Sequence, residues 1–343
     1  MSLATRTLVV LVSFLMAVPL AFSGQPDAVA AQGNRADFCA EPNDEFQQAC
    51  DLPPDTMATS RLFHANDVDA YRVLARDFDA TLRVELTEMP HSYRATVLDW
   101  NGKSIATSDD RGVAELTLPM PGVYYVMVDS QSGEFSDDAP YRVRHTVSYA
   151  SGQPPTLLDY SSFGQNSSYS SPRGYSLVWE NGRLTLTLEG TGSEQSPFDQ
   201  VIYASNKDGQ IHAANVVMVV DTRAISGSQP GSMLEFRNPN TVVGGYQLMV
   251  NHARRQARLM LYDHERARRT VLSDWTTVES IEPAGVSRLV VRAIGTRITG
   301  FVNGQQVADV ENDRYAAGRM SFGGLTWDDP ATIRFDNMLV TGK

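Results

Sequence analysis

Hydrophobic and polar residues alternate along most of the chain with a period of two. Six stretches in the first half show this pattern or are rich in β-branched and aromatic residues: 69–75, 80–86, 94–100, 114–118, 122–130 and 140–148. Turn-forming sequences separate them, among them NGK, SDDRG and PMPG. Alternation of this kind predicts half-buried β-strands. Because the strands recur about every ten residues without a helical period, the first half is predicted to be a β-sandwich.

The second half continues the β pattern with longer strands. Its strand-like stretches are 175–190, 213–225, 244–263, 286–312, 318–325 and 331–343. Asn-Gly pairs in ENG (180–182) and VNG (302–304) predict hairpin turns, since both central positions of such turns take positive φ. The predicted fold class is therefore all-β, with two β-sandwiches in tandem. The predicted domains are 34–149 and 157–343, joined by a Gly- and Pro-rich linker at 150–156.

The first 31 residues have the layout of a secretory signal peptide and leader. Arg6 precedes an apolar run at 8–22, and small residues at 21–23 and 28–30 offer cleavage sites. The run is short for a membrane span of about 20 residues. We therefore expect a protein that is secreted, extracellular or cell-surface, without membrane insertion after cleavage. An uncleaved N-terminal anchor is the alternative.

Charge is distributed unevenly between the two halves. Residues 34–149 carry 20 acidic and 10 basic side chains, a net of −10, whereas 150–343 carry 19 acidic and 18 basic, a net of −1. An acidic surface argues against a nucleic-acid partner and suits the binding of cations. Solubility alone is the other interpretation of this charge.

The chain has two cysteines, Cys39 and Cys50, which bracket a short acidic segment. Two thiols in an oxidising compartment are usually paired. We therefore predict a Cys39–Cys50 disulfide, with two buried free thiols as the alternative. A loop of this length is stabilised by about 2–3 kcal/mol in the chain-entropy model.

Five motifs occur in order in the first half: EPND (41–44), LFHANDVDAYRV (62–73), TLRVELTE (81–88), VLDWNGKSIATSDD (97–110) and MPGVYYVMVDSQSG (120–133). Together they resemble the bacterial pre-peptidase C-terminal domain, which is also the collagen-binding module of clostridial collagenases. The resemblance covers about 110 residues. It implies a small, secreted, non-catalytic sandwich of jelly-roll type. Some members of that family bind calcium where the acidic N-terminal segment meets the Asp-rich turn before the D-x-Y strand.

Oxygen-bearing side chains are concentrated at those two places. Calcium takes six to eight hard oxygen ligands from carboxylates, amides and carbonyls. The resemblance carries over best to Glu41, Asn43, Asp44 and Asp69, and Asn66 stands where related modules can use an acidic ligand. The predicted set of metal ligands is Glu41, Asn43, Asp44, Asn66, Asp67 and Asp69, with Ca²⁺ as the cofactor. The alternative is that the aspartates only form turns and that 41–44 is a solvated cap.

The last third of the chain carries a second resemblance. The stretch VVRAIGTRITGFVNGQQVADVENDRYAAGRMSFGG, followed by ATIRFDNMLV, is similar to the end of concanavalin-like and laminin-G-like jelly rolls. It looks like those related to family-16 glycoside hydrolases and to the 3-keto-disaccharide hydrolase domain. The resemblance implies a second sandwich with a face that related domains use for sugars.

Catalytic motifs are missing from the sequence. Family-16 glycosidases place two Glu around an Asp on one strand, and the nearest imitation here is Asp309, Glu311 and Asp313, on what looks like an exposed edge. Trp327, in the loop LTWDDPA, is the best candidate for an exposed sugar platform. We therefore predict a non-enzymatic binding or adhesion protein whose partner is a glycan or an extracellular matrix-type protein. The alternatives are an atypical glycoside hydrolase and a structural accessory or sensor ectodomain.

Overall fold

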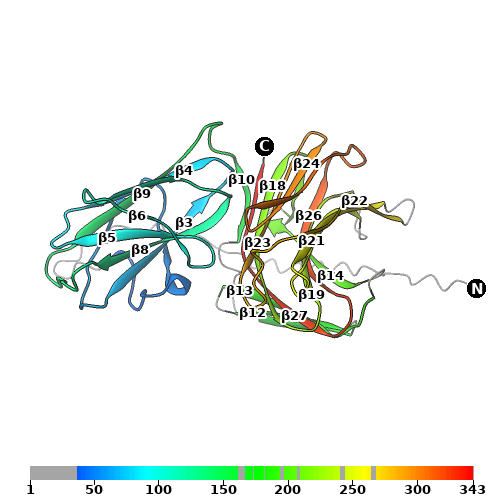
Figure 1. Ribbon diagram of the computed structural model, residues 1–343, viewed down its shortest axis with the longest axis horizontal. Coiled ribbons are helices and arrows are strands. Elements are labelled where there is room, and N and C mark those ends of the chain that lie inside the picture. The colour runs from blue at the N-terminus through cyan, green and yellow to red at the C-terminus, as the bar shows by residue number, and fades with distance from the viewer. Residues whose placement is uncertain are drawn as a thin grey trace, which may run out of the picture.

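The computed structural model describes residues 37–160, 167–172, 174–180, 182–193, 197–206, 209–239, 244–263 and 268–342. The predicted signal peptide and leader (1–31) and Asn181 of the predicted turn at 180–182 lie outside the described residues. Figure 1 shows two β-bodies side by side, with the N-terminal one in blue through cyan to blue-green and the C-terminal one in green to red. Within the described residues, no helix is long and apolar enough to cross a membrane.

The N-terminal body is a sandwich of a five-stranded and a four-stranded sheet, in the orders β1-β3-β8-β5-β6 and β2-β9-β4-β7. Its elements are η1 (Phe46–Gln48), β1 (Cys50–Asp51), β2 (Ala58–Ser60), β3 (Val68–Ala75), β4 (Ala80–Thr87), β5 (Tyr93–Leu98), β6 (Ser104–Thr107), β7 (Val113–Thr117), β8 (Gly122–Ser130) and β9 (Tyr141–Tyr149). Burial alternates along β4 as the sequence predicts, because every second side chain faces the other sheet. Tyr71, Tyr124, Leu82 and Val143 from the two sheets meet in one core.

The C-terminal body is built from two larger sheets and a small hairpin. Its strands are β10 (Thr156–Tyr160), β11 (Ser167–Ser171), β12 (Tyr175–Glu180), β13 (Arg183–Leu188), β14 (Phe198–Tyr203), β15 (Ser205–Asn206), β16 (Gly209–Gln210), β17 (His212–Ala213), β18 (Val216–Ser226), β19 (Pro230–Asn238), β20 (Gly245–Asn251), β21 (Gln256–Asp263), β22 (Arg268–Thr277), β23 (Ser287–Ile294), β24 (Arg297–Val302), β25 (Gln305–Glu311), β26 (Gly318–Thr326) and β27 (Ala331–Gly342).

One sheet of this body has the order β11-β12-β13-β27-β18-β23-β24-β25, with β10 also on β27. The other has the order β14-β26-β19-β20-β21-β22, with β17 also on β26. Leu186, Met218, Leu234 and Leu248 fill the core between them. The predicted all-β fold of tandem jelly-roll sandwiches is confirmed.

The two bodies also share apolar contacts with each other. The core of the N-terminal sandwich continues into Val217, Val219, Val290 and Leu339, which lie on the outer side of the C-terminal nine-stranded sheet. The rings of Phe78 and Phe301 pack across the junction with their centroids 5.0 Å apart. Burial of apolar surface on both sides therefore holds the two sandwiches together.

A buried arginine lies at the centre of this junction. Arg288 in β23 donates through Nε and Nη2 to the carboxylate of Asp221 in β18, both at 2.7 Å. It also reaches into the other sandwich, where Nη2 donates to the Val123 carbonyl at 2.9 Å and the guanidinium lies 4.4 Å from the Trp100 ring centroid. Both charged side chains are essentially unexposed.

Candidate functional site

The segment at 39–50 is tied down at both ends. Cys39 and Cys50 form a disulfide, with Cα atoms 6.0 Å apart, which confirms the predicted bridge. After the bridge, Cys50 and Asp51 pair in parallel with β3, and inside the loop the Asn43 carbonyl accepts a hydrogen bond from Ala70 N at 3.0 Å. The loop therefore lies along β3, next to the turn that precedes this strand.

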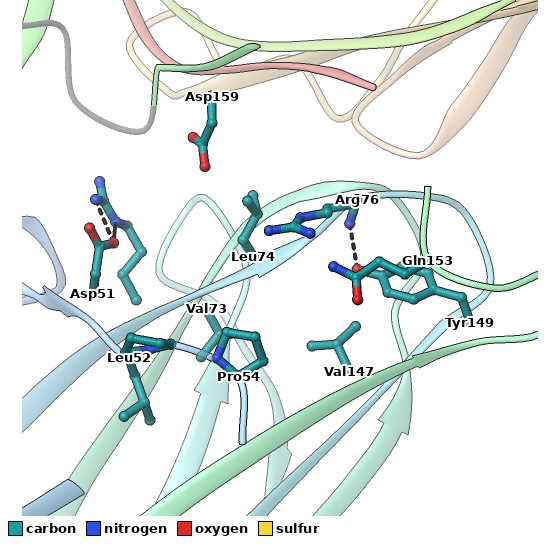
Figure 2. Close-up of a pocket in the computed structure, with 12 residues that line it drawn as sticks. Asp51, Leu52, Pro54, Val73, Leu74, Arg76, Val147, Tyr149, Gln153 and Asp159 are labelled. Atoms are coloured by element: carbon teal, nitrogen blue, oxygen red, sulfur yellow. Dashed lines mark hydrogen bonds and ion pairs between the residues drawn. The ribbon is translucent and has the colours of Figure 1, made fainter. Parts of the chain in front are cut away.

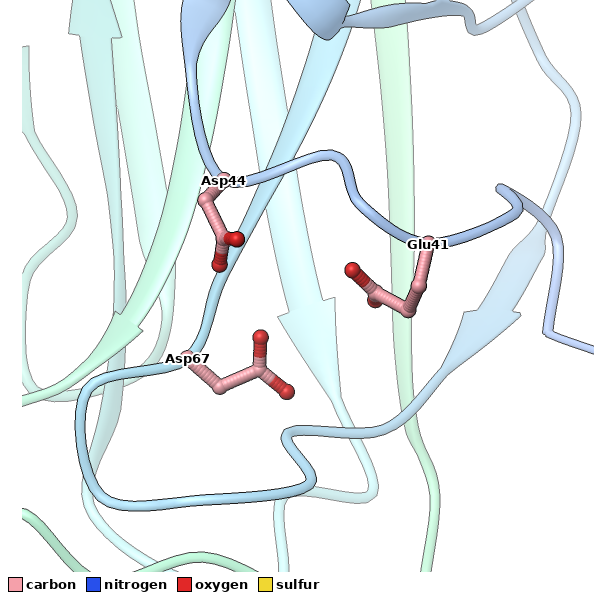
Figure 3. A group of neighbouring side chains, drawn as sticks. All are labelled: Glu41, Asp44 and Asp67. Atoms are coloured by element: carbon pink, nitrogen blue, oxygen red, sulfur yellow. The ribbon is translucent and has the colours of Figure 1, made fainter.

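Three carboxylates from these two segments converge. The side-chain oxygens of Glu41, Asp44 and Asp67 include one from each that lie within 4.8 Å of one another. Figure 3 shows the three carboxylates directed toward a common space between the loop and the turn. Backbone N–H groups hold all three in place: Val68 N donates to Asp44 Oδ1 at 3.3 Å and Phe63 N donates to Asp67 Oδ2. Asn43 N donates to Glu41 Oε2 at 3.1 Å.

Two other predicted ligands lie in a buried layer beside this cluster. Asp69 is fully buried and accepts hydrogen bonds from Asn43 Nδ2 at 2.9 Å and from the Tyr141 hydroxyl. Burial raises the pKa of Asp69 to about 7. Asn43 is also buried, and its Oδ1 atom has no hydrogen-bond partner in the described part of the chain. Asn66 is exposed. The structure thus brings the carboxylates of Glu41, Asp44 and Asp67 together, whereas the Asp69 carboxylate is hydrogen-bonded by side chains of the protein.

The carboxylates of the cluster are close enough for their negative charges to act on one another. Burial raises the pKa of Asp67 and of Glu41, and the negative charges of the neighbouring carboxylates raise both further. Among the described residues, no lysine or arginine forms an ion pair with Glu41, Asp44 or Asp67. The donor set of hard carboxylate oxygens fits calcium, and the unpartnered Asn43 Oδ1 is a further oxygen in the same loop.

The expectation that Trp327 is an exposed platform is wrong. Its indole is 2% exposed and packs against Met233, Met249 and Leu325. It also meets Trp275 edge-on, with ring centroids 5.9 Å apart. Trp275 in turn carries the Arg258 guanidinium 4.3 Å from its ring centroid. The loop position suggested exposure, but the indole is covered by the methionine side chains of β19 and β20 that it contacts.

In the acidic triplet of Asp309, Glu311 and Asp313, the first two side chains are bound by neighbouring residues at the edge of the sheet. Strand β25 is the last strand of its sheet, as the sequence suggested. Asp309 is held by Arg297 on β24, with Arg297 Nη2 and Asp309 Oδ2 2.8 Å apart, and the Thr296 hydroxyl donates to Glu311. Arg297 lowers the pKa of Asp309, which is the opposite of what a proton donor in glycoside hydrolysis requires.

Sequence reasoning missed a buried carboxylate in the other sheet. Glu235 in β19 is fully buried and accepts hydrogen bonds from Asn238 Nδ2 at 2.8 Å, Ser321 Oγ at 3.1 Å and Gln247 Nε2 at 2.8 Å. Burial raises its pKa to about 7. The alternation in LEFRN (234–238) places Glu235 on the face opposite Leu234 and Phe236, which face the core. That alternation alone suggests exposure, so no signal in the sequence marked the site.

Comparison with known proteins gives similarities of fold alone. No protein-family model matches the chain, and no curated protein matches it. The carbohydrate-binding module CBM66 from Bacillus subtilis is 13% identical, with 55% of this chain and 97% of that chain covered at a TM-score of 0.33. A Bacillus subtilis protein of unknown function with a galectin-like fold is 10% identical, with 55% and 96% covered at a TM-score of 0.38.

A third similar structure belongs to an enzyme. The catalytic domain of an endo-1,3-beta-glucanase (laminarinase) from Thermotoga petrophila RKU-1 is 11% identical, with 51% of this chain and 82% of that chain covered at a TM-score of 0.34. At these identities and scores the neighbours assign no activity to this chain.

Proposed function

We propose that the chain is an exported, non-enzymatic binding protein that uses calcium to order its N-terminal sandwich and recognises a glycan or an extracellular matrix-type protein. The observation that carries the calcium part is the convergence of Glu41, Asp44 and Asp67 within 4.8 Å. Three carboxylates this close repel one another unless a cation or protons neutralise them. A bound calcium would place the disulfide-closed loop against β3 and fix this end of the sandwich.

The contacts of Asp309 and Glu235 suit a binding role better than catalysis. In the acidic triplet at 309–313, Asp309 forms an ion pair with Arg297. Both carboxylate oxygens of Glu235 accept hydrogen bonds from neutral side chains. The shared core and Arg288 join the two sandwiches, so a ligand would meet one continuous surface. The predicted signal peptide and the disulfide would suit work outside the cell.

The test is an array of glycans and matrix proteins probed with the full chain in calcium and again in chelator. We expect one class of ligand to bind, and binding to weaken in chelator and in the Asp67→Asn variant. The Asp110→Asn variant removes an exposed charge on a turn and should behave as the unchanged protein. Absence of any ligand on the array contradicts the binding role, and equal binding with and without calcium contradicts the role of the metal.

One observation favours a second function, an atypical glycoside hydrolase. A pKa near 7 is typical of a carboxyl group that donates a proton in such a reaction, and burial raises the pKa of Glu235 to about 7. The side chain is unexposed, so this function also requires the surrounding strands to open before a substrate reaches it. The full chain should be screened for release of reducing sugar from each array hit. The proposed binding role predicts no release. Release that disappears in Glu235→Gln would replace binding with hydrolysis.

A further inference from the structure

A cavity of about 160 Å³ lies where the two sandwiches meet. Its walls come from the segment after β1, from β3 and the end of β9 in the N-terminal sandwich, and from β10 in the C-terminal one (Figure 2). For comparison, a cavity of about 150 Å³ inside a protein core accommodates one benzene molecule. The space therefore suits one six-membered ring, and it opens to solvent beside the exposed Gln153 and Asp159, where substituents of the ring can extend.

The backbone of Arg76 is hydrogen-bonded on both sides of this junction, and its guanidinium extends into the cavity. Its N–H donates to the Tyr149 hydroxyl at 2.9 Å, and its carbonyl accepts from Thr341 Oγ1 of the C-terminal sandwich at 3.1 Å. Figure 2 shows the guanidinium directed into the cavity. It forms no hydrogen bond or ion pair with any residue that the structure describes. The neighbouring Arg72, by contrast, is paired with Asp51 at 2.6 Å.

The other walls supply hydrogen-bonding groups and apolar surface. The carboxylate of Asp159 points into the cavity from the opposite side, and the Gln153 amide lies next to Arg76 (Figure 2). Pro54, Leu74 and Val147 add aliphatic surface between these polar groups. A guanidinium binds a carboxylate through two parallel N–H···O bonds, whereas a carboxylate or amide accepts hydrogen bonds from hydroxyls.

We propose that this cavity binds a uronic acid residue, a sugar ring that carries a carboxylate. The ligand carboxylate pairs with Arg76, its hydroxyls donate to Asp159 and Gln153, and its C–H face packs on the aliphatic wall. This inference rests on the proposed glycan binding and names the class of glycan. It also explains why an unpaired arginine is fixed at the place where the two sandwiches meet.

The test is an NMR titration of the full chain with D-glucuronate and D-galacturonate, with D-glucose and acetate as probes that lack the carboxylate or the ring. We expect at least one uronate to bind, and glucose and acetate each to bind at least tenfold more weakly. Arg76→Gln should weaken uronate binding roughly ten- to hundredfold, because a hydrogen-bonded charge pair contributes about 1.5–3 kcal/mol. Arg76 acts in the fold through its backbone, so this variant should unfold at the same denaturant concentration as the unchanged protein.

Arg223→Gln is the matched control, since Arg223 is an exposed arginine away from the cavity. In the backbone register of β18 and β27 it lies opposite Arg334, seven residues before Thr341 on β27. It should bind uronate as the unchanged protein does. Equal binding of acetate, or of uronate by Arg76→Gln, would overturn the proposal. If Arg76→Gln binds the array ligands as the unchanged protein does, the cavity is not the glycan site, but the proposed function stands. If the chain binds no glycan, both the proposed uronate site and the proposed glycan binding are wrong.

Discussion

The carboxylates in two regions of this molecule have different surroundings. Asp221 is buried, whereas in the acidic cluster Asp67 is buried, Asp44 half-buried and Glu41 exposed. At the junction, the Asp221 carboxylate receives two hydrogen bonds from Arg288 and a third from Asn337 Nδ2 at 3.0 Å. At the end of the N-terminal sandwich, Glu41, Asp44 and Asp67 face one another with no arginine or lysine paired to them in the described chain. Asp221 thus has an internal cation as its partner, whereas for the acidic cluster we propose a cation from solution.

The difference indicates what each region does. A buried charge is tolerated only when it is paired and hydrogen-bonded, and an internal partner such as Arg288 makes the pairing permanent. The junction is therefore a fixed structural element. If the acidic cluster binds calcium as proposed, the stability of this end of the N-terminal sandwich changes with the calcium concentration.

The largest effect is expected where the internal cation is removed. Arg288→Met leaves the Asp221 carboxylate buried without its partner, and removing one member of a buried pair costs about 3–5 kcal/mol. Guanidinium unfolding of the full chain measures the loss. The double variant Asp221→Asn/Arg288→Met removes the orphaned charge and should recover part of the stability. A loss below about 1 kcal/mol in the single variant would show that the pair does not hold the junction.

A smaller effect is expected at the glycine that accommodates this arginine. Gly122 has φ +124°, and a Cβ there would lie 2.6 Å from Arg288 Cζ. Gly122→Ala therefore combines backbone strain with a clash at the buried guanidinium, and should cost about 1–3 kcal/mol. Gly152→Ala is the control, because Gly152 has φ +80° but no atom within 4 Å of the added Cβ. Equal losses of unfolding free energy in the two variants would mean that the guanidinium is not closely fitted.

Glu235 shows a third arrangement, in which a buried carboxylate is hydrogen-bonded by neutral side chains and has a raised pKa. Burial raises its pKa from the ordinary 4.5 to about 7, so between these values the folded state holds a proton that the unfolded state has lost. This group's contribution to stability therefore falls as pH rises through that window, by up to about 1.4 kcal/mol per pH unit. Urea unfolding across the window should show the decrease, and Glu235→Gln should remove it. The exposed Glu180 provides the control, and a Glu180→Gln protein that loses the same pH dependence would contradict the assignment.

The strands and turns could be predicted from local pattern. The predicted strand at 122–130 coincides with β8, and Asn303 and Gly304 take the positive φ values, 49° and 83°, that the Asn-Gly turn requires. Strand β6 was not predicted, since its side chains at Ser104–Thr107 do not alternate in burial. Local periodicity therefore indicates a strand only where one face is buried.

The polar sites depended on contacts between distant segments. The resemblance predicted that 41–44 and 67–69 lie together, and they do, but not that Tyr141 and Asn43 would provide hydrogen bonds to Asp69. Arg288 is 67 residues from Asp221, and on its strand it occupies a position that would be exposed in an isolated sandwich. Its burial follows from the second sandwich, which alternation along one strand does not reveal.

Calorimetric titration of calcium into the full chain shows whether the acidic cluster binds a cation from solution. We expect one binding event per chain, its loss in Asp67→Asn, and its persistence in Asp110→Asn, which changes an exposed turn. Heat of binding that is absent at millimolar calcium, or unchanged in Asp67→Asn, would rule out the proposed calcium site and leave Glu41, Asp44 and Asp67 as parts of turns.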